Sequence, residues 1–314
     1  MKETLPQAGR SLKRPLSSLV GASAAACVTL MSASALADGP NPFDQPMAQA
    51  WPARRVWNDQ AETEFGQFVT AIGRGVSEHR CGTLSRCLNN PRINPLHVAS
   101  RRPLNLHADC GDVPYTLRAY FAFRQGLPFV WARDTVGHGR DRRYRSSVRP
   151  AGLRRWTDYR TPRALFNALA SDVDSGFYRM GPEVAGSDTY PTRVDRHSVH
   201  PGTVYYNPNG HVLIVWRVDP DGQVHMIDGH PDNSMSARTL TDRYPGGSRS
   251  DGGGFRNWRR VAVQGEVRQA LNSEIPDRVD EQYDRRRWLI SGERVPFQRW
   301  VRARLMVKSP HSGR

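Results

Sequence analysis

A hairpin-like stretch in the second half of the chain constrains the fold more than any other part of the sequence. Residues 203–206 and 211–218 are rich in β-branched and aromatic side chains, a composition that favours strands. Asp219-Pro220-Asp221-Gly222 is a turn signature, and residues 223–228 are suited to the returning strand. The chain is therefore expected to contain antiparallel strands, and a purely helical fold is excluded.

Helical patterns occur on both sides of a cysteine-containing segment in the first half of the chain. Asn58 is a good N-cap, and the apolar residues after it recur at helical spacing: Phe65, Phe68, Val69, Ile72 and Val76. Thr161-Pro162 starts a second amphipathic pattern that runs to Ser171. With 27 Gly and 23 Pro in 314 residues, many loops must separate these elements. The patterns together predict an α+β fold.

The segment around Cys110 predicts a thiol at the beginning of a helix. Asp109 is suited to cap the helix, with Asp112 three residues on, and Gly126 supplies the stop signal. Pro114 lacks an N–H, so the alternative is that the helix begins later and Cys110 lies in the loop just before it. In either case the helix dipole and the free N–H groups favour a thiolate.

The hairpin supplies candidate bases for that thiol. A two-residue turn at Pro220-Asp221 sets a register in which His211 lies opposite His230, with Asp228 on the same face. An imidazole beside a carboxylate or a second imidazole is the base-and-orienter pair of a cysteine triad. A shift by one residue would bring His225 to this face instead. The simpler alternative is that these are ordinary surface histidines.

Together the two segments resemble the papain-like superfamily, which includes NlpC/P60 cell-wall peptidases and transglutaminase-like proteins. Asp109-Cys110 and the helix end Gln125-Gly126-Leu127-Pro128 resemble the Asp-Cys start and Gly-x-Pro end of the family's helix. Pro201-Gly202-Thr203-Val204-Tyr205-Tyr206 and Gly210-His211-Val212 are similar to the two strands of NlpC/P60 proteins. The spacing from His211 to Asp228 is more like that of the transglutaminase-like branch.

The resemblance covers residues 104–230 and implies roles for four residues. Cys110 would be the nucleophile, His211 the base and Asp228 the orienter, with His230 as its substitute. The expected fold is α+β with a papain-like core, in which the cysteine at a helix N-terminus packs on an antiparallel sheet. The expected organisation is a signal peptide (1–37), a helical N-terminal region (38–103), the papain-like domain (104–264) and a basic C-terminal extension (265–314).

The first 37 residues have the features of an export signal. A basic start precedes a long uncharged run, and Ala35-Leu36-Ala37 matches the small-x-small cleavage pattern. A membrane-spanning helix is the alternative, since the run is long enough. Cys27 raises lipidation as a minor option, but Ala24 stands where a lipoprotein signal normally has Leu. We therefore expect a periplasmic or secreted protein.

Removal of that segment leaves an odd number of cysteines. Cys81 and Cys87 are six residues apart and are expected to close a small disulfide loop, with Cys110 left as the free thiol. The alternatives are another pairing or an arbitrary buried thiol, and the sequence alone does not decide among them.

The charge balance limits the partners. Lys and Arg number 45 against 30 Asp and Glu, a formal charge of +15 that favours anionic wall or membrane surfaces and acidic ligands. Nucleic acid is not expected, since no binding motif is present. Histidines and acids around His197, His200 and Asp232 offer metal ligands, but no known zinc spacing is matched, so neither a metal nor a cofactor is expected.

These expectations favour an exported cysteine hydrolase that acts on amide bonds of a peptide or peptidoglycan-like envelope substrate. Two alternatives remain. One is a transglutaminase-like acyl transferase, because the same thioester can react with an amine. The other is a catalytically inactive envelope-binding protein that uses the same cleft.

Overall fold

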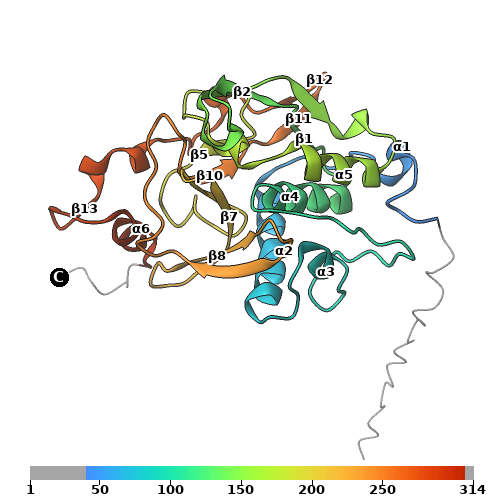
Figure 1. Cartoon of the computed structure of the whole chain (residues 1–314), viewed down its shortest axis with the longest axis horizontal. Coiled ribbons are helices and arrows are strands. Elements are labelled where there is room, and N and C mark those ends of the chain that lie inside the picture. Colours follow the sequence, from blue (N-terminus) through green and yellow to red (C-terminus); the bar gives the residue numbers. More distant parts are fainter. Residues whose placement is uncertain (1–39, 308–314) are drawn as a thin grey trace, which may run out of the picture. The chain divides into compact units, whose positions relative to one another are not determined.

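The computed structural model describes residues 40–307, in which six antiparallel strands form the central sheet in the order β5-β10-β6-β7-β8-β9 (Figure 1). Their bounds are β5 Thr189–Pro191, β6 Val204–Asn207, β7 His211–Val218, β8 Val224–Gly229, β9 Met235–Thr239 and β10 Gly254–Trp258. The predicted α+β class with antiparallel strands is confirmed. The predicted signal peptide (1–37) and Cys27 lie outside the described residues.

Two helices cover one face of this sheet. Helix α2, Asp59–Ser77, begins after Asn58, whose side chain accepts a hydrogen bond from the Ala61 N–H, as predicted. Its predicted apolar face is buried and lies along β7, β8 and β9. Gly73 permits the closest approach, because a Cβ there would lie 2.3 Å from the Trp216 side chain. Helix α4, Asp112–Gln125, packs beside α2 on β7 and β8.

Helix α5, Pro162–Asp172, extends this layer by packing against α4. The Thr161 hydroxyl accepts from the Ala164 N–H and Pro162 occupies the first turn, so the predicted start of this helix is confirmed. The helices bury a dense aromatic cluster beneath them. Trp51, Phe65, Phe121 and Tyr120 are all 1% exposed, and these side chains pack helix α4 against the sheet.

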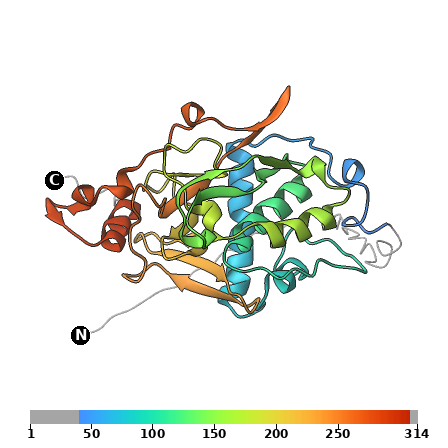
Figure 2. The ribbon, with the colours of Figure 1, turned by 45° about the horizontal axis from the view of Figure 1, so that its top comes forward.

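The opposite face of the sheet is covered by the C-terminal segment. Alternate residues Leu213 and Val215 of β7 pack with Met226 of β8 beneath helix α6, Phe297–Leu305. Both ribbon views place α6 on the far side of the sheet from α2 (Figures 1 and 2). Residues 265–307, the described part of the expected basic extension, therefore contribute a second apolar cluster to the sheet.

The β7–β8 hairpin differs from the prediction near its turn. Val218 pairs with Val224 rather than with Gln223, because the loop holds three residues, 220–222, with Gly222 at a φ of 82°. A β-bulge at Trp216 then removes the extra residue. From Ile214 opposite Ile227 onward, the register is the predicted one. The predicted two-residue turn is wrong, and the bulge compensates for it before the strand reaches His211.

Shorter elements complete the fold. Much of the polar, Arg-rich segment 137–150 belongs to a hairpin of β2, Thr135–His138, and β3, Ser146–Pro150. Strand β10 ends at Trp258, and β11 begins at Val261. The remaining elements are α1 Met47–Ala50, α3 Leu84–Leu88, β1 Val130–Ala132, β2 Thr135–His138, β3 Ser146–Pro150, β4 Leu153–Arg155, β11 Val261–Gln264, β12 Glu266–Gln269, β13 Leu289–Ile290, β14 Glu293–Arg294, and the 3₁₀ turns η2 Arg142–Tyr144, η3 Trp156–Asp158, η4 Ser175–Tyr178, η5 Asn272–Glu274, η6 Glu281–Tyr283 and η7 Arg285–Arg287.

Within the described part of the chain, no helix has both the length and the apolar character required to cross a membrane.

Candidate active site

Cys110 lies in the loop just before helix α4, which is the second of the two predicted positions. The helix begins at Asp112, so Pro114 falls in the first turn, where helical N–H groups have no intrahelical partner. The proline therefore costs the helix no hydrogen bond. Asp109 and Asp112 bond reciprocally: the Asp109 N–H donates to Asp112 Oδ2 at 3.0 Å, and the Asp112 N–H donates to Asp109 Oδ1 at 3.4 Å. Asp109 Oδ1 also accepts from the Gly111 N–H at 2.8 Å. These bonds fix the loop that carries the thiol.

Two glycines allow this loop to lie directly against its neighbours. A Cβ at Gly229, at the end of β8, would lie 2.8 Å from the Asp109 carbonyl oxygen. A Cβ at Gly111 would lie 2.7 Å from the Asp174 carbonyl carbon. Cys110 is thus held between the C-terminal end of β8 and residues 174–175. Its Sγ lies 3.9 Å from the carbonyl oxygen of Gly210, just before β7.

His211 and Asp228 form the predicted pair beside the thiol. The His211 Nε2–H donates to Asp228 Oδ2 at 2.8 Å. Asp228 is 1% exposed, whereas a third of the His211 side chain is accessible. Because Nε2 is engaged with Asp228, Nδ1 is the ring nitrogen available to the sulfur of Cys110. The register established after the Trp216 bulge brings the two residues together from adjacent strands.

The electrostatics of this pair favour a charged imidazole. Burial acts against protonation of His211, but its hydrogen bonds with Asp228 and with Cys110 outweigh burial and raise its pKa to about 9. Burial would raise the pKa of Asp228, but hydrogen bonds from His211 and Ser236 outweigh it, so that pKa lies below the ordinary value. At neutral pH the pair is therefore an imidazolium held by a carboxylate, in contact with the sulfur of Cys110.

The acidic side chain nearest the helix start does not oppose a thiolate. Asp112 is 5% exposed, and burial together with the neighbouring Asp109 charge raises its pKa to about 8. Asp112 is therefore mostly protonated at pH 7 and adds little negative charge two residues from the sulfur of Cys110. Burial also raises the pKa of Asp174, although Arg142 opposes that effect.

His230 is near the pair but makes no direct hydrogen bond to His211. Their rings are stacked with centroids 6.1 Å apart. The Nε2 of His230 lies 2.8 Å from Ser236 Oγ and 3.6 Å from Asp228 Oδ1. Of the two candidates for the third residue, only Asp228 contacts the His211 ring nitrogen.

Ser236 and Arg238 were not identified from the sequence. Ser236 lies opposite Asp228 in the β8–β9 pairing and donates to its Oδ1 at 2.6 Å. Arg238 Nε lies 3.4 Å from Asp228 Oδ2. The signal that could have found them is the alternation of Met235, Ala237 and Thr239 with two polar residues, after the turn signature Pro231-Asp232-Asn233.

The other histidines singled out by the sequence lie elsewhere. His225, which a shifted register would bring to His211, bonds to Asp219 at 2.7 Å near the hairpin turn. His200 Nδ1 lies 2.9 Å from the Pro201 carbonyl oxygen, and His197 is exposed. In residues 40–307, no group of three or more His, Cys, Asp or Glu side chains is arranged to hold a metal ion.

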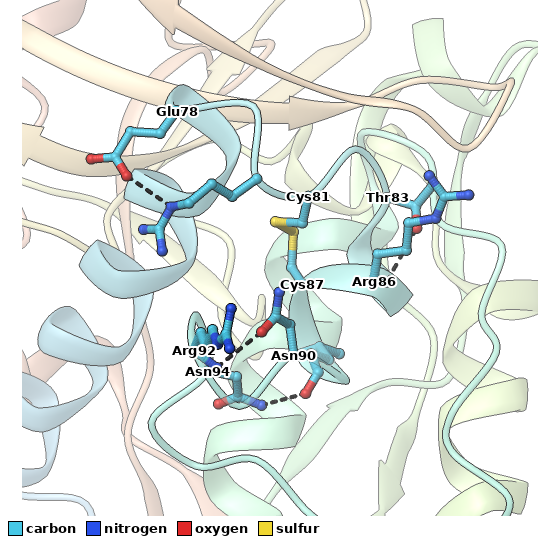
Figure 3. Close-up of a disulfide and its surroundings, with 10 residues drawn as sticks. Glu78, Cys81, Thr83, Arg86, Cys87, Asn90, Arg92 and Asn94 are labelled. Carbon is cyan, nitrogen blue, oxygen red and sulfur yellow. Dashed lines mark hydrogen bonds and ion pairs between the residues drawn. A yellow bond between two sulfur atoms is a disulfide. The ribbon is translucent and has the colours of Figure 1, made fainter.

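The predicted disulfide is confirmed: Cys81 and Cys87 are bridged, with an S–S distance of 2.06 Å, and Cys110 is free (Figure 3). The bridge closes the loop between α2 and α3. Within this loop, Ser85 Oγ donates to the carbonyl oxygen of Leu106 and accepts from its N–H. The Gly82 carbonyl accepts from the Met235 N–H of β9. The disulfide loop thus supports both the segment that leads to Cys110 and the strand that carries Ser236.

The Arg-rich hairpin forms one rim of the site. The Tyr144 hydroxyl donates to the Asn209 carbonyl oxygen at 3.1 Å, and Arg143 packs against Gly210, next to His211. Arg140 is exposed on the same loop. A cavity of about 680 Å³ opens at the other end of β6, around Pro201 and Gly202. Its lining includes neither Cys110 nor His211. The chemistry that the sequence predicts therefore lies outside that cavity.

The chain has no match among models of protein families, curated proteins or solved structures.

Proposed function

We propose that this protein is an exported cysteine hydrolase with a papain-like core, which cleaves amide bonds of a cell-envelope peptide. The observation that carries the proposal is the geometry at Cys110. The one free thiol of the described chain lies in contact with an imidazole that a buried carboxylate holds. A nucleophile, a base and an orienting acid in that order are the elements of a cysteine triad.

In the proposed reaction, the proton of the Cys110 thiol resides on His211 as the imidazolium, and the Cys110 thiolate adds to the amide carbonyl carbon. His211 returns the proton to the departing amine as the C–N bond breaks, which leaves a thioester on Cys110. Water then loses a proton to His211 and attacks the thioester carbon. The C–S bond breaks, and the products are a carboxylic acid and the free thiol.

Three features support an envelope substrate. The Cys81–Cys87 disulfide is typical of an oxidising compartment, which agrees with the export signal expected in residues 1–37. The formal charge of +15 favours binding to anionic wall or membrane surfaces. The exposed Arg140 on the rim favours a peptide that carries carboxylates.

The test combines reactivity with product analysis. Alkylation of Cys110 at pH 7, followed by mass spectrometry, should be about tenfold slower in His211→Ala than in wild type. Incubation with cell-wall peptide fragments should give new carboxyl termini in wild type and none in Cys110→Ala. Products joined to an added amine would instead indicate acyl transfer. Alkylation that does not depend on His211, together with unchanged fragments, would favour the inactive binding protein.

A further inference from the structure

The Asp228 carboxylate is held at both oxygens, although it is almost completely buried. Oδ2 accepts from His211, and Oδ1 accepts from the Ser236 hydroxyl at 2.6 Å. A buried carboxylate with one unbonded oxygen could rotate and present either oxygen to the imidazole. The Ser236 hydroxyl removes that freedom, because it fixes one oxygen from the neighbouring strand.

The direction of the hydrogen bonds links His230 to the same carboxylate. An ionised Asp228 can only accept hydrogen bonds, so the Ser236 hydroxyl must donate its hydrogen to Asp228 Oδ1. The His230 Nε2, 2.8 Å from Ser236 Oγ, must then be the donor. The chain of bonds runs from His230 through Ser236 to Asp228, and His230 makes no direct hydrogen bond with His211.

We propose that Ser236 is a positioning residue for the Asp228–His211 pair, and that His230 acts on the pair chiefly through Ser236. The proposal rests on the proposed function for its catalytic meaning, but not for its test. It also explains why the sequence offers two candidates, Asp228 and His230, for the residue that orients His211. Asp228 orients His211 directly, and His230 orients the serine that orients Asp228.

Several titratable groups surround the pair. Cys110, before α4, and Asp228, on β8, act directly on His211. His230 after β8, Arg238 on β9 and Tyr244 beyond β9 interact with Asp228. A test must therefore change the hydrogen bond without changing a charge. Ser236 meets this condition because its side chain is neutral.

The measurement is the titration midpoint of the His211 ring, followed by NMR in the full chain. It is paired with the rate of Cys110 alkylation at pH 7. In Ser236→Ala the midpoint is expected to fall from about 9 toward the ordinary 6.5, and alkylation to slow by about tenfold. Ser236→Thr keeps the hydroxyl. It is expected to keep the His211 midpoint near that of wild type and the alkylation rate within about twofold of wild type. Ser234→Ala is the matched control, because the Ser234 hydroxyl bonds to Asp232 instead.

A double-mutant cycle tests the order of the chain. His230→Ala alone is expected to slow alkylation by about threefold, and to add nothing in the Ser236→Ala background. If Ser236→Ala does not fold, His230→Gln replaces it in the test, because the amide keeps an N–H donor and is expected to restore the His230→Ala loss. Additive effects, an unchanged His211 midpoint in Ser236→Ala, or no rescue by His230→Gln would each overturn the proposal.

These outcomes are separable from failure of the proposed function. If wild type cleaves no envelope peptide, the His211 midpoint still reports whether Ser236 orients the pair. If wild type cleaves the peptide and Ser236→Ala leaves both readouts unchanged, the positioning role fails and the hydrolase stands.

Discussion

At the scale of single residues, Asp112 makes the stability of the fold depend on pH. Burial raises its pKa to about 8, far above the 3.8 of an ordinary aspartate. The folded state therefore holds a proton that the unfolded state releases, and Asp112 lowers stability progressively as the pH rises from about 4 to 8. Asp112→Asn cannot ionise, so its stability relative to wild type should rise by up to about 5 kcal/mol between pH 4 and pH 8. Urea unfolding at pH 4, 6 and 8 measures this difference, and a constant difference would contradict it.

Gly229 determines how closely the Cys110 loop approaches the sheet. A Cβ at this position would meet the Asp109 carbonyl oxygen and the Val113 side chain, each at 2.8 Å. Gly229→Ala should therefore cost about 1–3 kcal/mol of stability and slow Cys110 alkylation, because the loop must move. Gly82→Ala is the control, since nothing lies within 4 Å of its added Cβ. Equal losses of stability and alkylation rate in Gly229→Ala and Gly82→Ala would contradict a requirement for the close approach of the Cys110 loop to Gly229.

At the scale of elements, the sequence predicted α2, the start of α5 and both strands of the site hairpin. It did so because caps, helical periodicity and β-branched runs are local signals. The exact turn was not predictable, since a three-residue loop and a compensating bulge at Trp216 leave no distinct local pattern. Strand β9 was missed because only five residues pair there, three of them polar. Its absence from the prediction explains why Cys110, His211, Asp228 and His230 were found while Ser236 was not.

The disulfide loop is the element that connects two supports of the site. The Cys81→Ser, Cys87→Ser variant should lose about 2 kcal/mol, the entropy expected for a loop this short. It should also alkylate more slowly at Cys110, because Ser85 holds Leu106 before the thiol and Gly82 holds Met235 of β9. Thermal unfolding and alkylation at 20 °C measure the two effects. Lower stability with unchanged alkylation in the folded protein would separate the bridge from the site.

At the scale of the whole molecule, the sheet has two covered faces, and the C-terminal segment supplies one of them. The composition of residues 265–314 suggested a basic extension, since arginines dominate it. The apolar residues of α6 nevertheless fall on one side of the helix and are buried: Phe297, Trp300, Val301 and Leu305. In a helix of only nine residues with exposed arginines between the apolar positions, the amphipathic pattern is weak. Its function as a cover of the sheet becomes evident only from the packing of the folded chain.

Trp300 tests whether this covering is part of the cooperative fold. Its side chain is 3% exposed and packs in the cluster that includes Leu213 and Met226. His211 and Asp228 alternate with Val212 and Ile227, which face the helices, so they lie on the same sheet face as Leu213 and Met226, which α6 covers. Trp300→Ala should lower the free energy of unfolding by about 3–5 kcal/mol, whereas Arg299→Ala, exposed on the same helix, should change it by less than about 0.5 kcal/mol. Unfolding followed both by tryptophan fluorescence and by exposure of Cys110 to alkylation gives the decisive comparison. Coincident transitions in wild type mean that the core and the site unfold together. An earlier fluorescence transition that is lost in Trp300→Ala would mean that the C-terminal segment detaches from a site that remains folded.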